Sequence, residues 1–233
     1  MSTVTSPLLR LPLELRREIY SHLVFPTFTC MRFHNMPAVV STHTLNPSLA
    51  YVCSQLNAEF LAYYDDINLF MIKIVASLHW FPRTNIIQDH PIYRRMRRLR
   101  IAVHIDETFL SQYPSFGVEG MGELMRGTCR TVCRSIAQAP ALRELVLDLQ
   151  VQLRMGEMVE EAQIEWMKRI VQPFEMLKHV DRIWRCRGEG HMREDTRVEG
   201  LLWNALEGIL SAKIAPSTRV MPAASTTKFR QRF

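Results

Sequence analysis

The first helix-forming segment of the chain has apolar residues at every fourth position. The segment is residues 8–24, LLRLPLELRREIYSHLV, and its apolar stripe consists of Leu15, Ile19 and Leu23, with Tyr20 and Val24 beside it. This spacing predicts an amphipathic helix with a wide apolar face. Pro12 suits the start of that helix, because the first turn has no partner for the N–H that proline lacks. Periodicity alone indicates an ordinary helix packed on its own domain.

A second helix is predicted after a stretch without helical period. Residues 25–44 contain two prolines and fit either short strands or a long ordered loop. Asn46 is a suitable N-cap for the second helix, with Pro47 at its first position, and apolar residues then recur at helical spacing as far as Tyr64. Glu59 lies among these apolar positions, and two interpretations stay open: partial burial against an arginine, or a place on a solvated face.

From residue 69 onward the pattern changes to short apolar strands that alternate with helices. The strand segments are rich in aliphatic and β-branched residues, whereas the helical segments have apolar residues three or four positions apart. The predicted strands are residues 69–75, 99–105, 142–149 and 182–186. The predicted helices are residues 89–96, 119–139, 157–177 with a break at Pro173, and 196–212.

This alternation predicts an α/β fold, with α+β as the alternative. Each segment that joins two strands after residue 106 is long enough to cross over the sheet, so we expect one sheet with at least one parallel pair. The three long helices after residue 106 should cover one face of that sheet. Trp184 and Trp203 should lie in the interface between sheet and helices, because large aromatic residues dominate such burial.

Three of the strands are introduced in similar ways, by a charged residue before a short apolar run. Their anchors, Leu99, Leu145 and Ile183, are 46 and 38 residues apart, which is too uneven for a strict solenoid. The arrangement resembles an irregular leucine-rich-repeat unit, in which the motif L-x-x-L-x-L is only partly met.

Two separate segments resemble the F-box-like proteins of fungi. Residues 11–23 match the pattern LPxELRxxIYxxL. Residues 49–59 match L-x-x-V-C-x-x-x-x-x-E, and a tyrosine, a polar turn with asparagine and a strand follow in the family's order. In that family the Leu-Pro pair and the apolar helix positions bind a Skp-type adaptor of a cullin ubiquitin ligase. Carried over, the resemblance implies six adaptor-binding residues: Leu8, Leu11, Pro12, Leu15, Ile19 and Leu23.

The resemblance also implies a division of the chain and a function. An F-box-like helical module would occupy residues 1–66, an α/β partner-binding body residues 67–212, and a basic, disordered tail residues 213–233. The implied function is that of a non-enzymatic interaction adaptor, the substrate receptor of a Skp–cullin–F-box ubiquitin ligase. Its partners would be a Skp-type protein and an unidentified protein substrate. The alternative within this class is a degenerate F-box scaffold without a ligase role.

The positive charge of the chain is concentrated in its last residues. The 233 residues have a formal net charge of +6, and residues 213–233 alone hold five basic residues and no acid. The other 212 residues hold 24 basic and 23 acidic residues. The body is therefore nearly neutral, which argues against a nucleic-acid-binding domain.

A cluster of arginines precedes the second predicted strand. It consists of Arg94, Arg95, Arg97, Arg98 and Arg100. The first four could form a clamp for a phosphate or an acidic peptide, because guanidinium groups bind such anions at two points. This cluster, together with the basic tail of residues 213–233, is the basis of the alternative function, a binder of nucleic acid or phosphopeptides. The near-neutral body instead favours pairing with the protein's own acids, such as Asp106, Glu107 or the glutamates of residues 157–165.

The sequence contains no signature of catalysis, metal binding or a cofactor. It lacks a G-x-S-x-G elbow, a glycine-rich phosphate loop and an H-E-x-x-H motif. Four candidate metal ligands, Cys30, His34, His43 and Cys53, do not have the spacing of a known zinc finger. Cys129 and Cys133 lie one helical turn apart and are expected to be small core residues. We therefore expect no catalytic residues, no metal and no cofactor.

The overall composition is that of a globular intracellular protein. Hydrophobic residues make up 47% and charged residues 22% of the chain, and the five cysteines have no paired spacing. The first ten residues do not form a signal peptide, and no uninterrupted apolar stretch is long enough to span a membrane. We expect a location in the cytoplasm, the nucleus or both.

Overall fold

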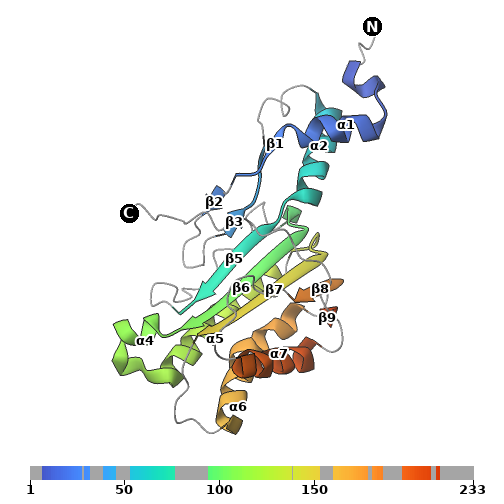
Figure 1. Cartoon of the computed structure of the whole chain (residues 1–233). Helices are drawn as coiled ribbons and strands as arrows, with labels where there is room; N and C mark the ends of the chain where they lie inside the picture. The colour runs from blue at the N-terminus through green and yellow to red at the C-terminus, as the bar shows by residue number, and fades with distance from the viewer. Residues whose placement is uncertain are drawn as a thin grey trace.

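The computed structural model describes residues 7–27, 29–31, 39–45, 53–76, 94–137, 139–152, 160–177, 180–185, 196–210 and 214–215. Within this part of the chain, a seven-stranded sheet is packed against helices, and a smaller N-terminal helical unit projects from one end of the sheet (Figure 1).

The large sheet is mixed but mainly parallel. Its strands lie in the order β2 (Thr29–Met31), β3 (Val39–Ser41), β5 (Phe70–Val75), β6 (Arg98–Asp106), β7 (Glu144–Gln152), β8 (Arg182–Arg185) and β9 (Ile214–Ala215). β3 is antiparallel to both β2 and β5, whereas each strand from β5 to β9 is parallel to the next. The prediction of an α/β fold with the four central strands in one sheet is confirmed, and all four are parallel.

The helices that follow β6 lie on one face of this sheet. They are α4 (Thr108–Gln112), η4 (Pro114–Phe116), α5 (Gly117–Ile136), α6 (Glu160–Val171), η5 (Gln172–Leu177) and α7 (Thr196–Leu210). Alternate residues of β6, from Leu99 to Ile105, are buried in one core with residues of α5, α6 and α7. Successive right-handed crossovers that step in one direction along a sheet place every connection on the same face, which accounts for the single helical layer.

Of the two tryptophans expected between sheet and helices, only Trp203 is there. Trp203 is buried in the main core, and the guanidinium of Arg185 lies 4.6 Å from the centre of its ring. Trp184 is in register with Val146, and it is Ile183, next to it, that shares the helix-covered face with Leu145. The prediction for Trp184 is wrong because neighbouring residues of a strand point to opposite faces.

The N-terminal unit consists of η1 (Pro7–Arg10), α1 (Leu13–Ser21), α2 (Ser54–Ile67) and an antiparallel pair of short strands, β1 (Val24–Phe25) and β4 (Thr44–Leu45). α2 begins later than the sequence predicts. Cys53 has an extended backbone, and its Sγ accepts a hydrogen bond from the backbone N–H of Leu56, so Cys53 is the N-cap. The predicted cap at Asn46 and the first position at Pro47 lie outside the described residues.

The sheet crosses two of the predicted boundaries. β3 pairs with β5, so a strand from within residues 1–66 is hydrogen-bonded to the body. At the other end, Ile214 and Ala215 pair with Ile183 and Trp184, so the segment predicted to be a disordered tail begins with a strand. Residues 216–233 lie outside the described part of the chain, as does most of the predicted helix 89–96.

The two cysteines of α5 are core residues, as predicted. Cys129 and Cys133 are both fully buried in the main core. Burial raises the pKa of the Cys129 thiol to about 12 and also raises that of Cys133, so both thiols are protonated and unreactive at neutral pH.

Candidate protein-interaction surface

α1 packs against α2 through one side only. Tyr20 is fully buried, with its ring centre 5.4 Å from that of Phe60 and 6.0 Å from that of Tyr63. Val24 is buried in the same small core, and Leu23 packs against it from the edge. The side of α1 that faces its own domain is therefore centred on Tyr20 rather than on the predicted stripe.

The opposite side of α1 presents apolar side chains to solvent. Leu15 is 53% exposed and lies about 140° around the helix from Tyr20 at 3.6 residues per turn. Ile19, on the same side as Leu15, is half-buried, as are Leu8 and Leu11, while Pro12 is exposed. Of the six adaptor-binding residues predicted from the resemblance, Leu23 alone belongs to the edge of the small core.

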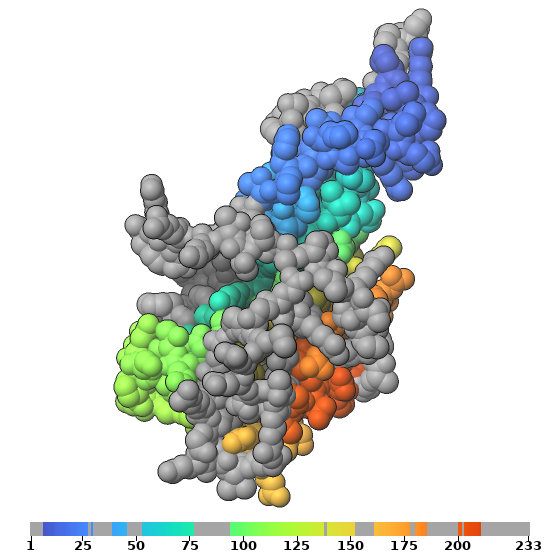
Figure 2. Space-filling model, in the orientation of Figure 1, coloured from blue at the N-terminus to red at the C-terminus, as the bar shows by residue number. Residues whose placement is uncertain are grey.

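Two further exposed apolar residues of the N-terminal unit were not predicted. Leu13 is 40% exposed and Phe25 is 47% exposed. The described part of the chain has five exposed large apolar side chains, and three of them, Leu13, Leu15 and Phe25, lie within thirteen residues. Leu13 is seven positions before Tyr20 and therefore about 20° from it around the helix, so it does not extend the Leu15 side. Single exposed apolar residues are normal, and the candidate interaction surface consists of Leu15, Ile19 and the Leu-Pro turn. Figure 2 shows this N-terminal region standing apart from the helical layer of the body.

An arginine connects the Leu-Pro turn to α2. Arg16 donates from Nε and Nη2 to the two carboxylate oxygens of Glu59, at 2.8 and 3.1 Å. Its Nη1 donates to the backbone carbonyl of Leu11 at 2.5 Å and, at 3.4 Å, to that of Leu9. The first of the two interpretations of Glu59, partial burial against an arginine, is thus confirmed.

The surroundings of Glu59 stabilise its charged form. Burial alone would raise the pKa of this carboxyl, but hydrogen bonds from Arg16, Gln55 and Tyr20 and the charge of Arg16 outweigh burial and lower it. The pKa of Tyr20 is raised, by burial and by the neighbouring Glu59. Glu59 is consequently ionised at neutral pH and remains an acceptor for Arg16.

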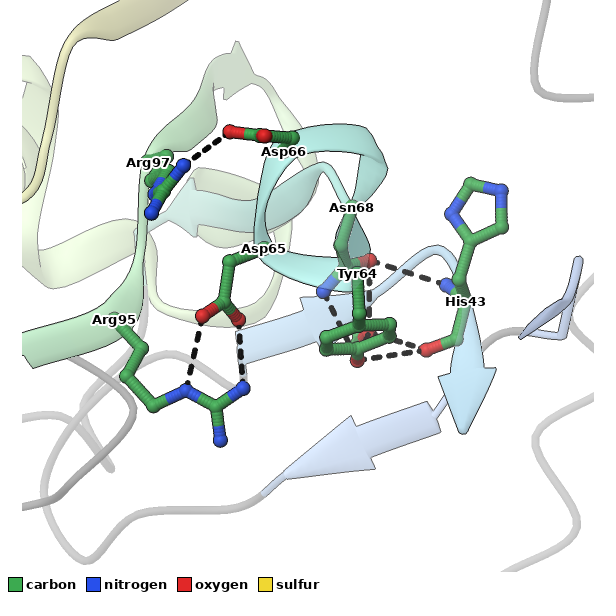
Figure 3. A network of polar contacts seen from close by, with 8 residues as sticks. His43, Tyr64, Asp65, Asp66, Asn68, Arg95 and Arg97 are labelled. Carbon is green, nitrogen blue, oxygen red and sulfur yellow. Dashed lines mark hydrogen bonds and ion pairs between the residues drawn. The ribbon is translucent and has the colours of Figure 1, made fainter. Parts of the chain in front are cut away.

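The arginine cluster is paired with acids of this chain. Arg95 forms a two-point ion pair with Asp65, at 2.9 and 3.1 Å, and Arg97 pairs with Asp66. Figure 3 shows how both arginines, which precede β6, point toward the carboxylates of Asp65 and Asp66 in the last turn of α2. The described residues therefore favour internal pairing over an anion clamp, although the partners are not the ones expected.

The later arginines of the cluster pair across the sheet. Arg98 donates to Glu144 at 3.0 Å, and Arg100 to the buried Asp148 at 2.6 Å. Arg94 is exposed and also takes part in an interaction within the chain. The sequence could not name these partners, because they lie about 30 to 50 positions away and meet the arginines only through the fold.

A second network of hydrogen bonds joins the end of α2 to the β3–β4 turn. The amide oxygen of Asn68 accepts hydrogen bonds from the Ser41 hydroxyl at 3.0 Å and the backbone N–H of His43 at 3.2 Å. The Asn68 amide donates to the Tyr64 hydroxyl at 3.0 Å, and that hydroxyl donates to the carbonyl of His43 at 3.0 Å (Figure 3). The tyrosine and asparagine of the family-like segment thus join the N-terminal unit to the sheet.

The candidate metal ligands do not form a group in the described part of the chain. Nowhere among the described residues do three or more cysteine, histidine or acidic side chains come together in a way that could hold a metal ion. His43 belongs to the Asn68 network, and its pKa is lowered, chiefly by burial and also by the charge of Arg98. The side chains of Cys30 and His34 lie outside the described residues.

Comparisons of this chain with known proteins find no family model, no curated protein and no solved structure that matches it. Among the described helices, none has the length and apolar character needed to cross a membrane.

Proposed function

We propose that this chain is an F-box-like interaction adaptor that binds a Skp-type protein through the outer side of α1 and the Leu-Pro turn. In this proposal the α/β body receives the protein to be ubiquitylated, and the complex works in the cytoplasm, the nucleus or both. The resemblance of residues 11–23 and 49–59 to the fungal F-box-like family supplies the class of partner.

One observation carries the proposal: α1 has two apolar sides and only one of them is used internally. Tyr20 faces α2 and is fully buried, whereas Leu15, on the other side, is 53% exposed next to the exposed Pro12. A helix buried only in its own domain would turn its apolar stripe toward that domain. An exposed apolar helix face that can enter a groove of another protein is a common mode of recognition.

The rival function, anion binding through the arginine cluster, has less support. Arg95, Arg97 and Arg98 are each engaged by a carboxylate of this chain. A phosphate would have to displace these carboxylates before it could bind. The degenerate scaffold stays open as the alternative, and the experiment below separates it from the ligase receptor.

The proposal is tested by affinity purification of the tagged chain followed by mass spectrometry. The wild-type chain should recover a Skp-type protein together with a cullin, and the double variant Leu15→Ala with Ile19→Ala should lose both. The matched control replaces Arg17 and Glu18, two exposed residues of the same helix, by alanine and should behave as wild type.

Circular dichroism must accompany the comparison, because Ile19 is half-buried and its truncation also removes contacts within the chain. Recovery of a Skp-type protein by a folded Leu15→Ala/Ile19→Ala chain would refute the proposed surface. Failure of the wild-type chain to recover any Skp-type protein would favour the degenerate scaffold.

A further inference from the structure

The Leu-Pro turn before α1 is held by polar contacts in addition to partial burial. η1 contributes no buried side chain, and Pro12, the N-cap of α1, makes no side-chain hydrogen bond to the helix. The side chain that reaches this turn is that of Arg16, which donates to the carbonyls of Leu11 and Leu9. Leu8, Leu9 and Leu11 are only half-buried, so burial of apolar groups alone does not fix the position of Leu11 and Pro12.

The same guanidinium is anchored to α2 at its other edge. Glu59 lies 43 positions along the chain from Arg16 and accepts two of its N–H groups. Gln55 and Tyr20 donate to Glu59 in turn, at 3.3 Å each. The Arg16 side chain is only 12% exposed and that of Glu59 only 23%. Hydrogen bonds in such a partly desolvated network are stronger than the same contacts in water.

We propose that Arg16 is a positioning residue, which holds the Leu11–Pro12 turn beside Leu15 by joining it to Glu59 on α2. Its consequence for adaptor binding rests on the proposed function. The planar guanidinium suits this task because it carries five N–H donors in a fixed fork, whereas the ammonium of lysine cannot serve two carbonyls and both carboxylate oxygens in this geometry. The surface is then composite, since its Leu-Pro part is ordered only when α2 is in place.

The experiment compares four variants of the full chain: Arg16→Met, Glu59→Gln, the charge-swap variant Arg16→Glu with Glu59→Arg, and Arg17→Met as the matched control on the same helix. Three quantities are measured. One is hydrogen exchange at the backbone amides of Leu11 and Arg16, which are bonded to the carbonyls of Leu8 and Pro12. The others are the affinity for a purified Skp-type adaptor protein and the thermal stability of the chain.

Arg16→Met should accelerate exchange in the turn and weaken adaptor binding by about tenfold or more, since hydrogen bonds to a charged donor are lost. Arg17→Met should change neither quantity. Glu59→Gln should have a smaller effect on the turn than Arg16→Met, because Arg16 can still donate to Leu11 and Leu9. Exchange in β6 and β7 should be unchanged in all variants.

The charge-swap variant, Arg16→Glu with Glu59→Arg, separates positioning of the turn from simple ion pairing. It can re-form an ion pair between α1 and α2, but the carboxylate that replaces the guanidinium on α1 cannot donate to a carbonyl. The proposal is supported if thermal stability recovers while hydrogen exchange in the turn stays fast and adaptor binding stays weak. It is overturned if thermal stability, slow hydrogen exchange in the turn and adaptor affinity all recover.

If the charge-swap variant does not recover its thermal stability, the comparison of Arg16→Met with Glu59→Gln decides. Equal acceleration of hydrogen exchange in the turn by these two variants overturns the proposal. A wild-type chain that does not bind the adaptor refutes the proposed function, and the hydrogen-exchange measurements still decide whether Arg16 positions the turn.

Discussion

Two glycines of α5 should respond to the same substitution with opposite signs. At Gly122, a Cβ atom would lie 2.3 Å from Nε1 and 2.8 Å from Cε2 of Trp166, so α5 and α6 approach each other too closely there for any side chain. The ring of Trp166 is almost fully buried and donates from Nε1 to the carbonyl of Val118 at 3.2 Å, so it cannot move aside freely. At Gly127, a Cβ atom would meet nothing within 4 Å.

The magnitudes follow from helix propensity and packing. Gly127→Ala should stabilise the protein by about 0.5–1 kcal/mol, the difference between alanine and glycine in a helix interior. Gly122→Ala gains the same amount but costs about 1–3 kcal/mol in overpacking and about 1 kcal/mol if the Trp166 hydrogen bond breaks. The propensity gain is common to both variants, so their free energies of unfolding should differ by about 1–4 kcal/mol.

Urea unfolding, followed by far-ultraviolet circular dichroism and by tryptophan fluorescence, measures this difference. Trp166→Phe removes the pyrrole nitrogen, so in a double-mutant cycle it should reduce the cost of Gly122→Ala. A Gly122→Ala chain as stable as Gly127→Ala would refute the close contact of α5 with α6, and with it the arrangement of the helical layer.

Three other outcomes are expected. Asn68→Ala should cost about 1–3 kcal/mol for each buried partner that it leaves unpaired, and urea unfolding should show no such loss for a surface substitution such as Ser54→Ala. Stability should fall as the pH drops below 6.5 and fall further below 4.5, the ordinary pKa values of His43 and Glu59. Both groups have lowered pKa values in the folded chain, so the unfolded chain takes up their protons first. In thermal unfolding at a series of pH values, His43→Gln should reduce the loss of stability that begins below pH 6.5. Deletion of residues 216–233, which leaves β9 intact, should remove most salt-sensitive binding to DNA in a filter assay, and tight binding by the truncated chain would point to the arginine cluster instead.

Long periodic segments were the part of the fold that the sequence could predict. β6 alternates buried and half-buried residues along its whole length, and the pattern from Leu99 to Ile105 is visible in the sequence. The short strands β1, β2 and β3 are two or three residues long and have no period to detect. β9 was missed for the same reason and because it lies in a segment with the composition of a tail.

The candidate surface was predictable only as a list of residues. The stripe of Leu15 and Ile19 is visible at a spacing of four. The sequence does not indicate whether this stripe or the side with Tyr20 is buried, because that depends on the position of α2. The pairing of Arg16 with Glu59 joins residues 43 positions apart, so no local pattern could indicate it. The two family-like segments contain one of these residues each, but they do not indicate that the residues are in contact.

The measurement that tests the central claim most directly is a calorimetric titration of the purified full chain with a purified Skp-type adaptor protein. We predict a saturable one-to-one complex whose affinity falls by about tenfold or more in the folded Leu15→Ala/Ile19→Ala variant, since buried apolar anchors dominate such interfaces. The affinity of an Arg17→Ala control should be unchanged. The absence of binding by the folded wild-type chain would contradict the claim that the outer side of α1 is an adaptor-docking surface.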